Sequence, residues 1–327
     1  MQTRKLGNSG ISVSALGLGC MSMGPFYGGE EDDGESQATL RRAVELGVTF
    51  FDTALSYGNG SCEALLGPVL KDHRDKITLA TKFGVYYKPD GIGFRTDPHY
   101  CHMCCDASLY RLKTDVIDLW YLHRVDPDVP VEETIGAMSQ MVKAGKVQAL
   151  GMSEVRPETL RKAHAVHPIS ALQSEYSLWS RDPEGDVLDT CRELGISLVP
   201  YSPLGRGFFT GTVTDQSDIR ENDRRAIFPR FSPDNLERNV PLLDVIKNIA
   251  QAKGCTMGQV AIAWVMAQGD DVIPIPGTRR RKYLEENVGA AEVTLDAEDL
   301  TRLDTAFPKG AAEGSRLPGD MAAASDR

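Results

Sequence analysis

The sequence predicts a (β/α)8 barrel, an α/β fold in which eight parallel strands alternate with helices around one core. Three observations support this fold. Strand-like and helix-like patterns alternate eight times, no linker or low-complexity stretch interrupts them, and a chain of 327 residues with 41% hydrophobic residues can bury one large core. We therefore expect residues 1–327 to form a single domain.

The predicted elements follow one another in regular order. Short apolar, β-rich runs predict the strands, and apolar residues at helical spacing predict the helices. The strands are expected near 16–20, 48–52, 77–82, 116–122, 147–151, 170–174, 196–201 and 272–275. The helices are expected near 36–46, 61–71, 99–111, 131–144, 156–166, 185–194, 239–268 and 279–289.

Three segments lie outside this alternation. Residues 1–14 contain the turn sequence Gly7-Asn8-Ser9-Gly10 between two short apolar runs, which predicts an N-terminal β-hairpin cap. The long loop 208–238 after the seventh strand is rich in charged and turn-forming residues; a loop of this length is typically a lid or clamp, or is disordered. The tail 307–327 is rich in Gly, Ala and Pro, and we expect it to run over the surface.

A doubly wound open sheet is the alternative fold. It would be favoured by a complete glycine fingerprint in the first turn between strand and helix. The stretch Gly17-Leu18-Gly19-Cys20-Met21-Ser22 lacks the third glycine. The barrel is therefore the better interpretation.

Charge, hydropathy and cysteine content indicate which kinds of partner and which cellular environment to expect. A net charge of -10 and a pI near 5.2 argue against nucleic acid. The sequence contains neither a leading basic-then-apolar segment nor a long apolar run. We therefore expect neither export nor membrane insertion. Seven cysteines, an odd number, fit a reduced cytoplasmic protein better than a disulfide scaffold. The sequence favours neither a monomer nor a homo-oligomer.

Four ionisable residues lie at the ends of three consecutive predicted strands. Asp52 ends the second strand and Tyr57 lies in the turn after it, while Lys82 and His123 end the third and fourth strands. Ligands of parallel α/β proteins bind at the carboxyl ends of strands, and neighbouring strands are about 5 Å apart. We therefore expect these four side chains to converge.

Such a group suggests proton transfer to a carbonyl oxygen. A free tyrosine has a pKa near 10 and is a poor acid at neutral pH. An ammonium from Lys82 beside the phenol would favour phenolate, and Asp52 would keep that lysine charged. Lowering the pKa of Tyr57 by about two units requires roughly 2.7 kcal/mol. The phenol could then protonate a carbonyl that receives a hydride, while His123 orients it.

Each of these residues taken alone has a structural interpretation. Asp52 could be a helix N-cap, Tyr57 a packing residue, Lys82 a solvated residue and His123 a structural histidine. Their convergence favours function. The run His99–Cys105 contains a Cys-x2-Cys spacing but no second pair, so we expect no metal site.

Several motifs follow one another along essentially the whole chain. They are Phe51-Asp52-Thr53-Ala54 with Tyr57-Gly58, Thr81-Lys82, Asp118-Leu119 with Leu122-His123, Gly151-Met152-Ser153, Tyr201-Ser202-Pro203-Leu204-Gly205-Arg206-Gly207, and Ile275-Pro276-Gly277-Thr278 with Glu286-Asn287. In this order they resemble the aldo-keto reductase family. The resemblance implies a barrel reductase that uses NADPH, with Asp52, Tyr57, Lys82 and His123 as its catalytic tetrad. The pattern is closest to bacterial and plant general aldehyde-ketone reductases and the pyridoxal-reductase-like branch.

The resemblance also implies cofactor contacts. Ser153 and Gln173 would hold the nicotinamide carboxamide, and Tyr201 would stack on its ring, whereas Glu154 stands where many relatives carry Asn. The other expected contacts are Cys20, Met21, Asp52, Ser202, Pro203, Leu204, Gly205, Arg206, Gly277, Arg279, Tyr283, Glu286 and Asn287. The cationic run 279–282 opens a helix, where acids are favoured, so it suggests a bound 2′-phosphate and hence NADPH rather than NADH. The run could instead be a solvated face.

The substrate is expected to be a fairly flat or apolar aldehyde or ketone, because aromatic residues are available around the site. The expected pocket residues are Phe26, Tyr57, Phe83, Tyr86, Trp120, His123 and Arg124. Two other classes of function stay open: a cofactor-sensing regulatory subunit of the same fold, and a metal-dependent barrel hydrolase that uses Asp52, His123 and Asp126.

Overall fold

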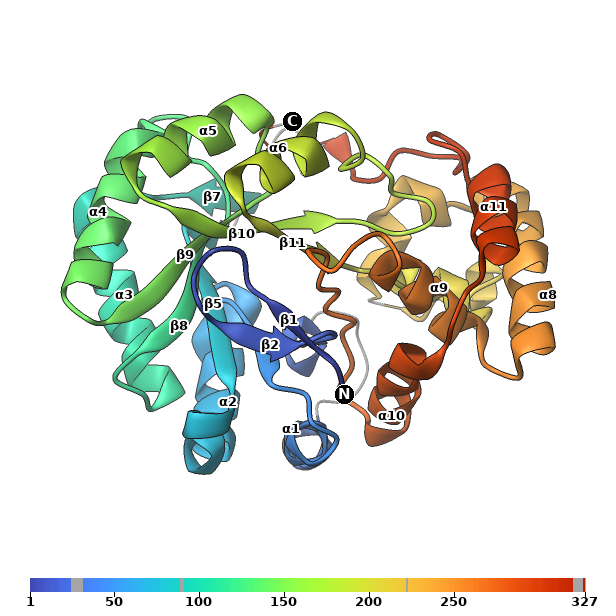
Figure 1. Cartoon of the computed structure of the whole chain (residues 1–327), viewed down its shortest axis with the longest axis horizontal. Helices are drawn as coiled ribbons and strands as arrows, with labels where there is room; N and C mark the ends of the chain where they lie inside the picture. Colours follow the sequence, from blue (N-terminus) through green and yellow to red (C-terminus); the bar gives the residue numbers. More distant parts are fainter. Residues whose placement is uncertain (25–31, 89–90, 222, 320–325, 327) are drawn as a thin grey trace.

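A curved parallel sheet surrounded by helices forms the centre of the computed structural model, which describes residues 1–327 except 25–31, 89–90, 222, 320–325 and 327 (Figure 1). Neighbouring strands in the sheet follow sequence order. They are β3 (Leu18–Gly19), β4 (Phe50–Asp52), β5 (Thr78–Phe83), β8 (Ile117–Leu122), β9 (Val147–Ser153), β10 (Ile169–Glu175) and β11 (Ser197–Tyr201). The predicted α/β barrel is confirmed.

The eighth predicted strand, 272–275, closes the barrel without forming a regular strand. On one side the N–H groups of Ile273 and Ile275 donate to β11. On the other side the carbonyls of Pro274 and Pro276 accept from the chain at β3. Because proline has no N–H, these two residues cannot return a hydrogen bond to β3. The closure is therefore made by isolated parallel bridges.

Helices lie around the sheet, and some of them pack on other helices rather than on the sheet (Figure 1). They are α1 (Asp33–Glu45), α2 (Ser61–Leu70), α3 (Pro98–Leu112), α4 (Val131–Lys143), α5 (Pro157–Val166), α6 (Asp186–Leu194), α7 (Pro233–Asn239), α8 (Leu243–Lys253), α9 (Met257–Met266), α10 (Arg281–Gly289) and α11 (Ala297–Ala306). The single helix predicted over 239–268 is wrong. Gly254, with φ +66°, ends α8, and a capping box at Thr256 starts α9. Helix α11 lies in a segment for which the sequence predicts no element.

Hydrophobic residues form two layers, one on each face of the sheet. Alternate residues of one strand point to opposite faces, so Leu119 and Tyr121 of β8 lie inside the barrel while Trp120 and Leu122 pack against the helices. The bottom of the inner layer is closed by the N-terminal hairpin, β1 (Thr3–Lys5) and β2 (Ser12–Ser14). The predicted cap is confirmed.

The long segment after β11 is packed against the rest of the protein. It contains α7 and the short 3-10 helices η4 (Gly205–Thr210), η5 (Gln216–Asp218), η6 (Arg224–Ile227), η7 (Pro229–Phe231) and η8 (Val240–Leu242). Its side chains Phe208, Phe209 and Phe231 are fully buried around Trp179, whose ring stacks on Phe208 at 4.3 Å between centroids. The described part of this loop is therefore ordered, and its function as a lid or clamp stays a prediction.

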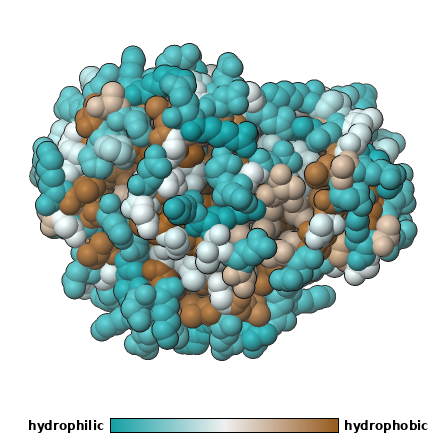
Figure 2. Space-filling view, viewed as in Figure 1, coloured by the Kyte–Doolittle hydropathy of each residue, from teal (hydrophilic) through white to brown (hydrophobic). Residues whose placement is uncertain are grey.

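A second, smaller hairpin follows β5. Strands β6 (Val85–Lys88) and β7 (Gly91–Phe94) pair antiparallel between the predicted strand 77–82 and the predicted helix 99–111. Hydrophilic residues cover much of the face that Figure 2 shows, with hydrophobic residues scattered between them. Among the helices that the structure describes, none combines the length and apolar character needed to cross a membrane.

Candidate active site

The structure brings the four expected polar side chains together at one end of the barrel. Asp52 and Lys82 lie two residues after Phe50 and Ala80, which point into the barrel, so they point the same way. Tyr57 begins the short helix η2 (Tyr57–Gly60) that follows β4. His123 directly follows β8, and its N–H donates to the Phe83 carbonyl at 2.9 Å. Parallel pairing of β4, β5 and β8 therefore assembles the group.

Lys82 is fully buried and uses three acceptors. Its Nζ donates to Asp52 Oδ1 at 2.5 Å, to the Thr53 carbonyl at 2.8 Å and to the Tyr57 hydroxyl at 3.4 Å. An ammonium has three N–H donors, and these contacts satisfy all of them. The second Asp52 oxygen accepts from Gln173 Nε2 at 2.8 Å. Each of the two Asp52 oxygens therefore has a hydrogen-bond partner.

Burial and ion pairing act on the pKa of Asp52 in opposite directions, and burial has the larger effect. Burial raises the pKa of Asp52, although Lys82 and its hydrogen bond oppose that rise. A carboxylate beside an ammonium remains charged more easily than one buried alone. We infer that Asp52 and Lys82 form an ion pair, because each supplies the charge that the other needs in a site with little solvent.

The expected lowering of the Tyr57 pKa is not found. Burial of the hydroxyl and the nearby Asp52 carboxylate raise the pKa of Tyr57 well above 10. The Asp52 charge offsets the ammonium, so Lys82 does not produce the predicted phenolate. Tyr57 therefore carries its proton at neutral pH, as a proton donor must, and Lys82 can stabilise the phenolate as that proton leaves.

His123 lies beside Tyr57, with the two rings perpendicular and their centroids 6.0 Å apart. Burial, with the charges of Arg124 and Lys82, lowers the pKa of His123 well below 6.5. The ring is therefore neutral at pH 7. One ring nitrogen, Nδ1, lies 3.4 Å from Ser56 Oγ. When Ser56 donates to Nδ1, the neutral ring carries its proton on Nε2 and can donate it to a ligand.

The inner and outer members of the group differ in exposure. Asp52 and Lys82 are buried, whereas Tyr57 and His123 are partly exposed. A ligand can therefore reach the phenol and the imidazole but not the ion pair behind them. This arrangement can deliver a proton and a hydrogen bond to one oxygen atom.

The segment after β11 forms a turn that suits a phosphate. Leu204 has a right-handed backbone (φ -87°, ψ 10°) and Gly205 a left-handed one (φ +57°). Successive amides in this conformation form a concave nest that binds anions. Ser202 and Arg206 also have positive φ, at +52° and +58°. The Arg206 guanidinium lies 3.0 Å from Glu175 Oε2.

A third group of expected contacts lies around the start of α10. Gly277 bridges to Gly19, which brings the closing segment against β3. Thr39 of α1 donates to the Arg279 carbonyl at 3.1 Å, and Glu286 accepts from Thr256 at 2.8 Å. Asn287 is buried and Tyr283 is 43% exposed. These residues line the junction of α1, α9 and α10.

Among the residues that the structure describes, no group of three or more His, Cys, Asp or Glu side chains could hold a metal ion. The cysteines of the predicted Cys-x2-Cys stretch, Cys101, Cys104 and Cys105, are buried in the outer hydrophobic layer.

Comparison with known proteins identifies the family. The family model described as "Aldo/keto reductase family" matches residues 15–307, which include all four residues of the converging group. This chain belongs to the aldo/keto reductase family. Members of the family are oxidoreductases that use NADH or NADPH to reduce carbonyl groups. The resemblance found in the sequence is confirmed at this level.

Individual relatives cover nearly the whole reductase. A probable aldo-keto reductase 1 from Glycine max is 44% identical over 319 residues, which is 97% of this chain and 92% of the relative. Among solved structures, the glycerol dehydrogenase of Gluconobacter oxydans has a TM-score of 0.86 at 25% identity, covering 97% and 98% of the two chains. A thermostable aldo-keto reductase in complex with epalrestat has a TM-score of 0.76 at 30% identity, covering 94% and 100%.

The residues present fit a nicotinamide dinucleotide. The amide nest at Leu204 and Gly205, with Arg206 beside it, supplies the donors that a pyrophosphate needs. Gln173 donates to Asp52 of the tetrad, and Ser153 Oγ accepts at 3.0 Å from Arg124, the residue after His123. These groups could hold the phosphates and the carboxamide of such a cofactor.

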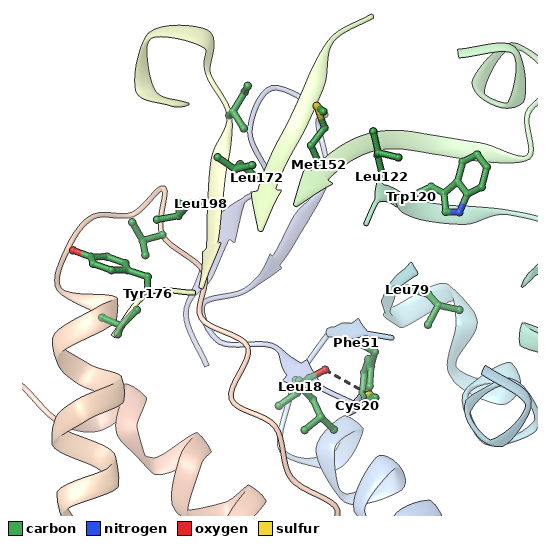
Figure 3. Packing of buried hydrophobic residues seen from close by; sticks show 14 of the residues in the cluster. Leu18, Cys20, Phe51, Leu79, Trp120, Leu122, Met152, Leu172, Tyr176 and Leu198 are labelled. Atoms are coloured by element: carbon green, nitrogen blue, oxygen red, sulfur yellow. Dashed lines mark hydrogen bonds between the residues drawn. The ribbon is translucent and has the colours of Figure 1, made fainter. Parts of the chain in front are cut away.

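Two expected pocket residues are corrected, and the side chain of one expected cofactor contact is buried. Phe83 and Trp120 are fully buried in the outer layer, where their rings stack at 4.5 Å, and Figure 3 shows Trp120 and Leu122 in this layer. They do not line the barrel mouth. Cys20 is also buried in the outer layer, and its thiol donates to the Leu18 carbonyl. The strand period of two, counted from Lys82 and His123, is the signal that excludes Phe83 and Trp120.

Other expected pocket residues have mixed outcomes. Tyr57 and His123 lie at the mouth, and Arg124 donates to the His123 carbonyl at 2.6 Å beside them. Tyr86 is 39% exposed on β6. Phe26 lies outside the described residues. Sequence reasoning missed Ser56, the partner of His123, and the contact of Gln173 with Asp52, because neither follows from local spacing.

Proposed function

We propose that this reductase uses NADPH to reduce an aldehyde or ketone to the alcohol, reversibly, with Tyr57 as the proton donor. The observation that carries this proposal is the chain of contacts from Asp52 through Lys82 to the Tyr57 hydroxyl. It places a protonated phenol at the partly exposed end and a buried ion pair behind it. When bound, the reduced nicotinamide supplies the hydride.

The proton step follows from these contacts. The carbonyl oxygen gains negative charge as its carbon is reduced, and the Tyr57 hydroxyl transfers its proton to that oxygen. Negative charge then develops on the phenol oxygen, 3.4 Å from the Lys82 ammonium. Asp52 and the Thr53 carbonyl fix that ammonium in place, so it need not reorient during the reaction. In the reverse direction, the phenolate accepts the proton of the alcohol.

His123 orients the substrate. Its lowered pKa keeps the imidazole neutral, so it acts as a hydrogen-bond donor rather than as a competing acid. Donors from Tyr57 and His123 then converge on one oxygen from two directions, which fixes the carbonyl plane.

The expected cofactor contacts form three groups, one each for the nicotinamide, the pyrophosphate and the adenosine end. Ser153 and the amide oxygen of Gln173 hold the carboxamide, and Tyr201 stacks on the nicotinamide ring. The nest at 202–206 holds the pyrophosphate, and Gly277, Arg279, Tyr283, Glu286 and Asn287 surround the adenosine end. The cationic run 279–282 supports NADPH over NADH, because a 2′-phosphate supplies the anion that a helix N-terminus and cations favour.

The substrate is a flat or apolar carbonyl compound that enters beside Tyr57, Tyr86 and His123. Arg124 contacts Ser153 and the His123 carbonyl, so it borders both the cofactor and the substrate positions. With Phe83 and Trp120 buried, the aromatic lining is smaller than the sequence suggests. The pyridoxal-reductase-like branch stays a prediction.

A turnover assay tests the proposal. The purified protein is mixed with NADPH and a panel of aldehydes and ketones, including para-nitrobenzaldehyde, and NADPH consumption is followed by absorbance. We expect steady turnover with at least one aromatic or apolar carbonyl compound and formation of the matching alcohol. Binding of NADPH without turnover of any panel member would contradict the proposal and favour a cofactor-sensing role.

A further inference from the structure

Two buried carboxylates lie side by side at the ends of β9 and β10. Glu154 is fully buried, and its backbone has φ +57°, a conformation that non-glycine residues rarely adopt. Its Oε1 accepts from the Glu175 N–H at 2.9 Å. Glu175 is 1% exposed, and its Oε1 accepts from Ser180 Oγ at 2.9 Å. Two adjacent buried acids require cations to remain charged.

One of these cations comes from the C-terminal tail. Arg316 donates through Nη1 and Nη2 to the two Glu154 oxygens, at 3.3 and 2.9 Å. Its Nη1 also lies 3.6 Å from Glu175 Oε2 and 3.4 Å from the Tyr201 hydroxyl. The expectation that the tail runs over the surface is therefore incomplete. Its arginine reaches the predicted nicotinamide side of the site from a distance of 162 residues in sequence.

The tail between Phe307 and Leu317, which we call the strap, is fixed along its length. Phe307 is fully buried against Phe209. The buried Asn239 side chain makes two hydrogen bonds to the Glu313 backbone, at 2.8 and 3.1 Å. Leu317 packs on the outer hydrophobic layer. These contacts deliver Arg316 to the acid pair in a defined position.

Glu175 is shared by two arginines of different origin. Arg206 belongs to the turn that we assign to the pyrophosphate, whereas Arg316 belongs to the strap, and both reach Glu175 Oε2. An arginine that pairs with a buried carboxylate cannot also give its full charge to a phosphate. If Arg206 turned to a phosphate with no replacement, Glu175 would lose an ion-pair partner in a buried site, which is costly.

We propose that Arg316 is a positioning residue that takes over Glu175 when Arg206 engages the cofactor phosphates, so that strap docking and NADPH binding strengthen each other. The inference rests on the proposed function, because it uses the assignment of Arg206 to the pyrophosphate. By linkage, a strap that favours the cofactor-bound state must in turn be held more firmly when the cofactor is bound. Arg316 need not touch the cofactor phosphates.

The main test measures NADPH affinity by fluorescence quenching in Arg316→Ala and in Arg302→Ala. Arg302 is an exposed arginine of α11, so its substitution makes the same charge change away from the site. We expect Kd to rise about tenfold or more in Arg316→Ala, and to change less than about twofold in Arg302→Ala. Equal affinity in Arg316→Ala and the wild type would overturn the inference.

A double variant identifies the route of the effect. In a Glu175→Gln background the neutral amide no longer needs a cation, so Arg316→Ala should raise Kd by less than about threefold. Arg316→Lys keeps the charge but loses the bidentate contact with Glu154. Its Kd for NADPH should lie between those of the wild type and Arg316→Ala. If Arg316→Ala raised the Kd of NADPH equally in the wild-type and Glu175→Gln backgrounds, Arg316 would not act by replacing Arg206 as the ion-pair partner of Glu175.

Hydrogen exchange of the strap provides a readout that does not depend on turnover. We expect backbone amides of 310–317 to exchange faster in Arg316→Ala than in the wild type without cofactor, and NADPH to slow their exchange in the wild type alone. NADPH binding that leaves strap exchange unchanged in the wild type would overturn the coupling but not the proposed function. A wild type that binds no NADPH would instead overturn the proposed function.

Discussion

The Lys82 ammonium lies 2.5 Å from Asp52 Oδ1, and 2% or less of either side chain is exposed. The pair is anchored from two further directions, because Gln173 donates to the other Asp52 oxygen and Lys82 donates to the Thr53 carbonyl. Water cannot replace either partner at this depth. The pair should therefore affect both the stability of the barrel and the chemistry at its mouth.

The first prediction concerns this ion pair. Lys82→Met leaves Asp52 charged and buried without its cation, so we expect the free energy of unfolding to fall by about 3–5 kcal/mol. Turnover should be lost as well, because the developing charge on Tyr57 is no longer stabilised. Urea unfolding followed by circular dichroism measures the change in stability.

The double variant Asp52→Asn/Lys82→Met is the matched control. It removes both charges and keeps an amide oxygen for Gln173, so its stability should return to within about 2 kcal/mol of the wild type while turnover stays absent. A double variant no more stable than Lys82→Met would show that the cost does not come from an unpaired Asp52 carboxylate.

The second prediction concerns Tyr57. Tyr57→Phe removes the proton donor but keeps the ring, so kcat/KM for reduction should fall by about 10²–10⁴-fold. The Kd of NADPH should change by less than about twofold, since we place Tyr57 against the substrate. Steady-state kinetics and fluorescence titration measure the two quantities. Tyr86→Phe is the control, because it removes a hydroxyl from a half-exposed ring of the hairpin β6–β7.

Near-wild-type turnover by Tyr57→Phe would exclude this residue as the acid. The raised pKa gives the same assay a second readout. Because burial and Asp52 raise the pKa of Tyr57 above 10, the wild-type rate of reduction should not fall through ionisation of the phenol below pH 10.

The third prediction concerns pH and His123. Its pKa is lowered well below 6.5 in the folded protein, whereas the unfolded chain takes up a proton near 6.5. The neutral His123 therefore contributes full stability above that pH, and the contribution is lost as the pH falls toward the folded pKa. The loss should reach up to about 1.4 kcal/mol per pH unit.

The free energy of unfolding is measured in urea from about pH 7.5 down to about pH 5 for the wild type and for His123→Gln. The difference between the two proteins isolates the contribution of His123 from that of other titrating groups. His123→Gln keeps a polar side chain but cannot titrate, so its stability should decline less over the acid part of that range. Parallel curves for the two proteins would mean that His123 is protonated as easily in the folded state as in the unfolded one.

The fourth prediction concerns the choice of cofactor. Arg279→Ala should weaken binding of NADPH by about tenfold or more and leave NADH within about twofold, because only NADPH carries the 2′-phosphate. Fluorescence titration with the two cofactors measures the ratio. Arg302→Ala matches the change in charge. Equal weakening of both cofactors would show that Arg279 does not contact the 2′-phosphate.

The fifth prediction follows from the correction of Trp120. This residue is buried against Phe83, so Trp120→Leu should lower the free energy of unfolding by about 3 kcal/mol through lost contacts and a cavity. The KM for carbonyl substrates should change by less than about twofold. Tyr86→Ala is the opposite case, with an expected rise in KM and little loss of stability. If Trp120→Leu altered the substrate preference, Trp120 would have to line the substrate pocket after all.

The sequence alone determined the fold and the place of the four converging residues. Apolar runs at regular intervals specify parallel strands, and polar residues at their carboxyl ends must then meet at one end of the barrel. Asp52, Lys82 and His123 could be found this way because strand ends are visible in the order of residues. The same period of two excludes Phe83 and Trp120 from the barrel mouth, because it places their side chains on the outer face.

The tertiary structure decided what local spacing cannot specify. Gln173 meets Asp52 across 121 residues and Arg316 meets Glu154 across 162, and neither contact leaves a periodic trace in the sequence. The pKa of Tyr57 is raised although an adjacent lysine alone would lower it, because burial and the charge of Asp52 act on the same oxygen. Such effects depend on which groups share one buried volume, and closure of the barrel determines that.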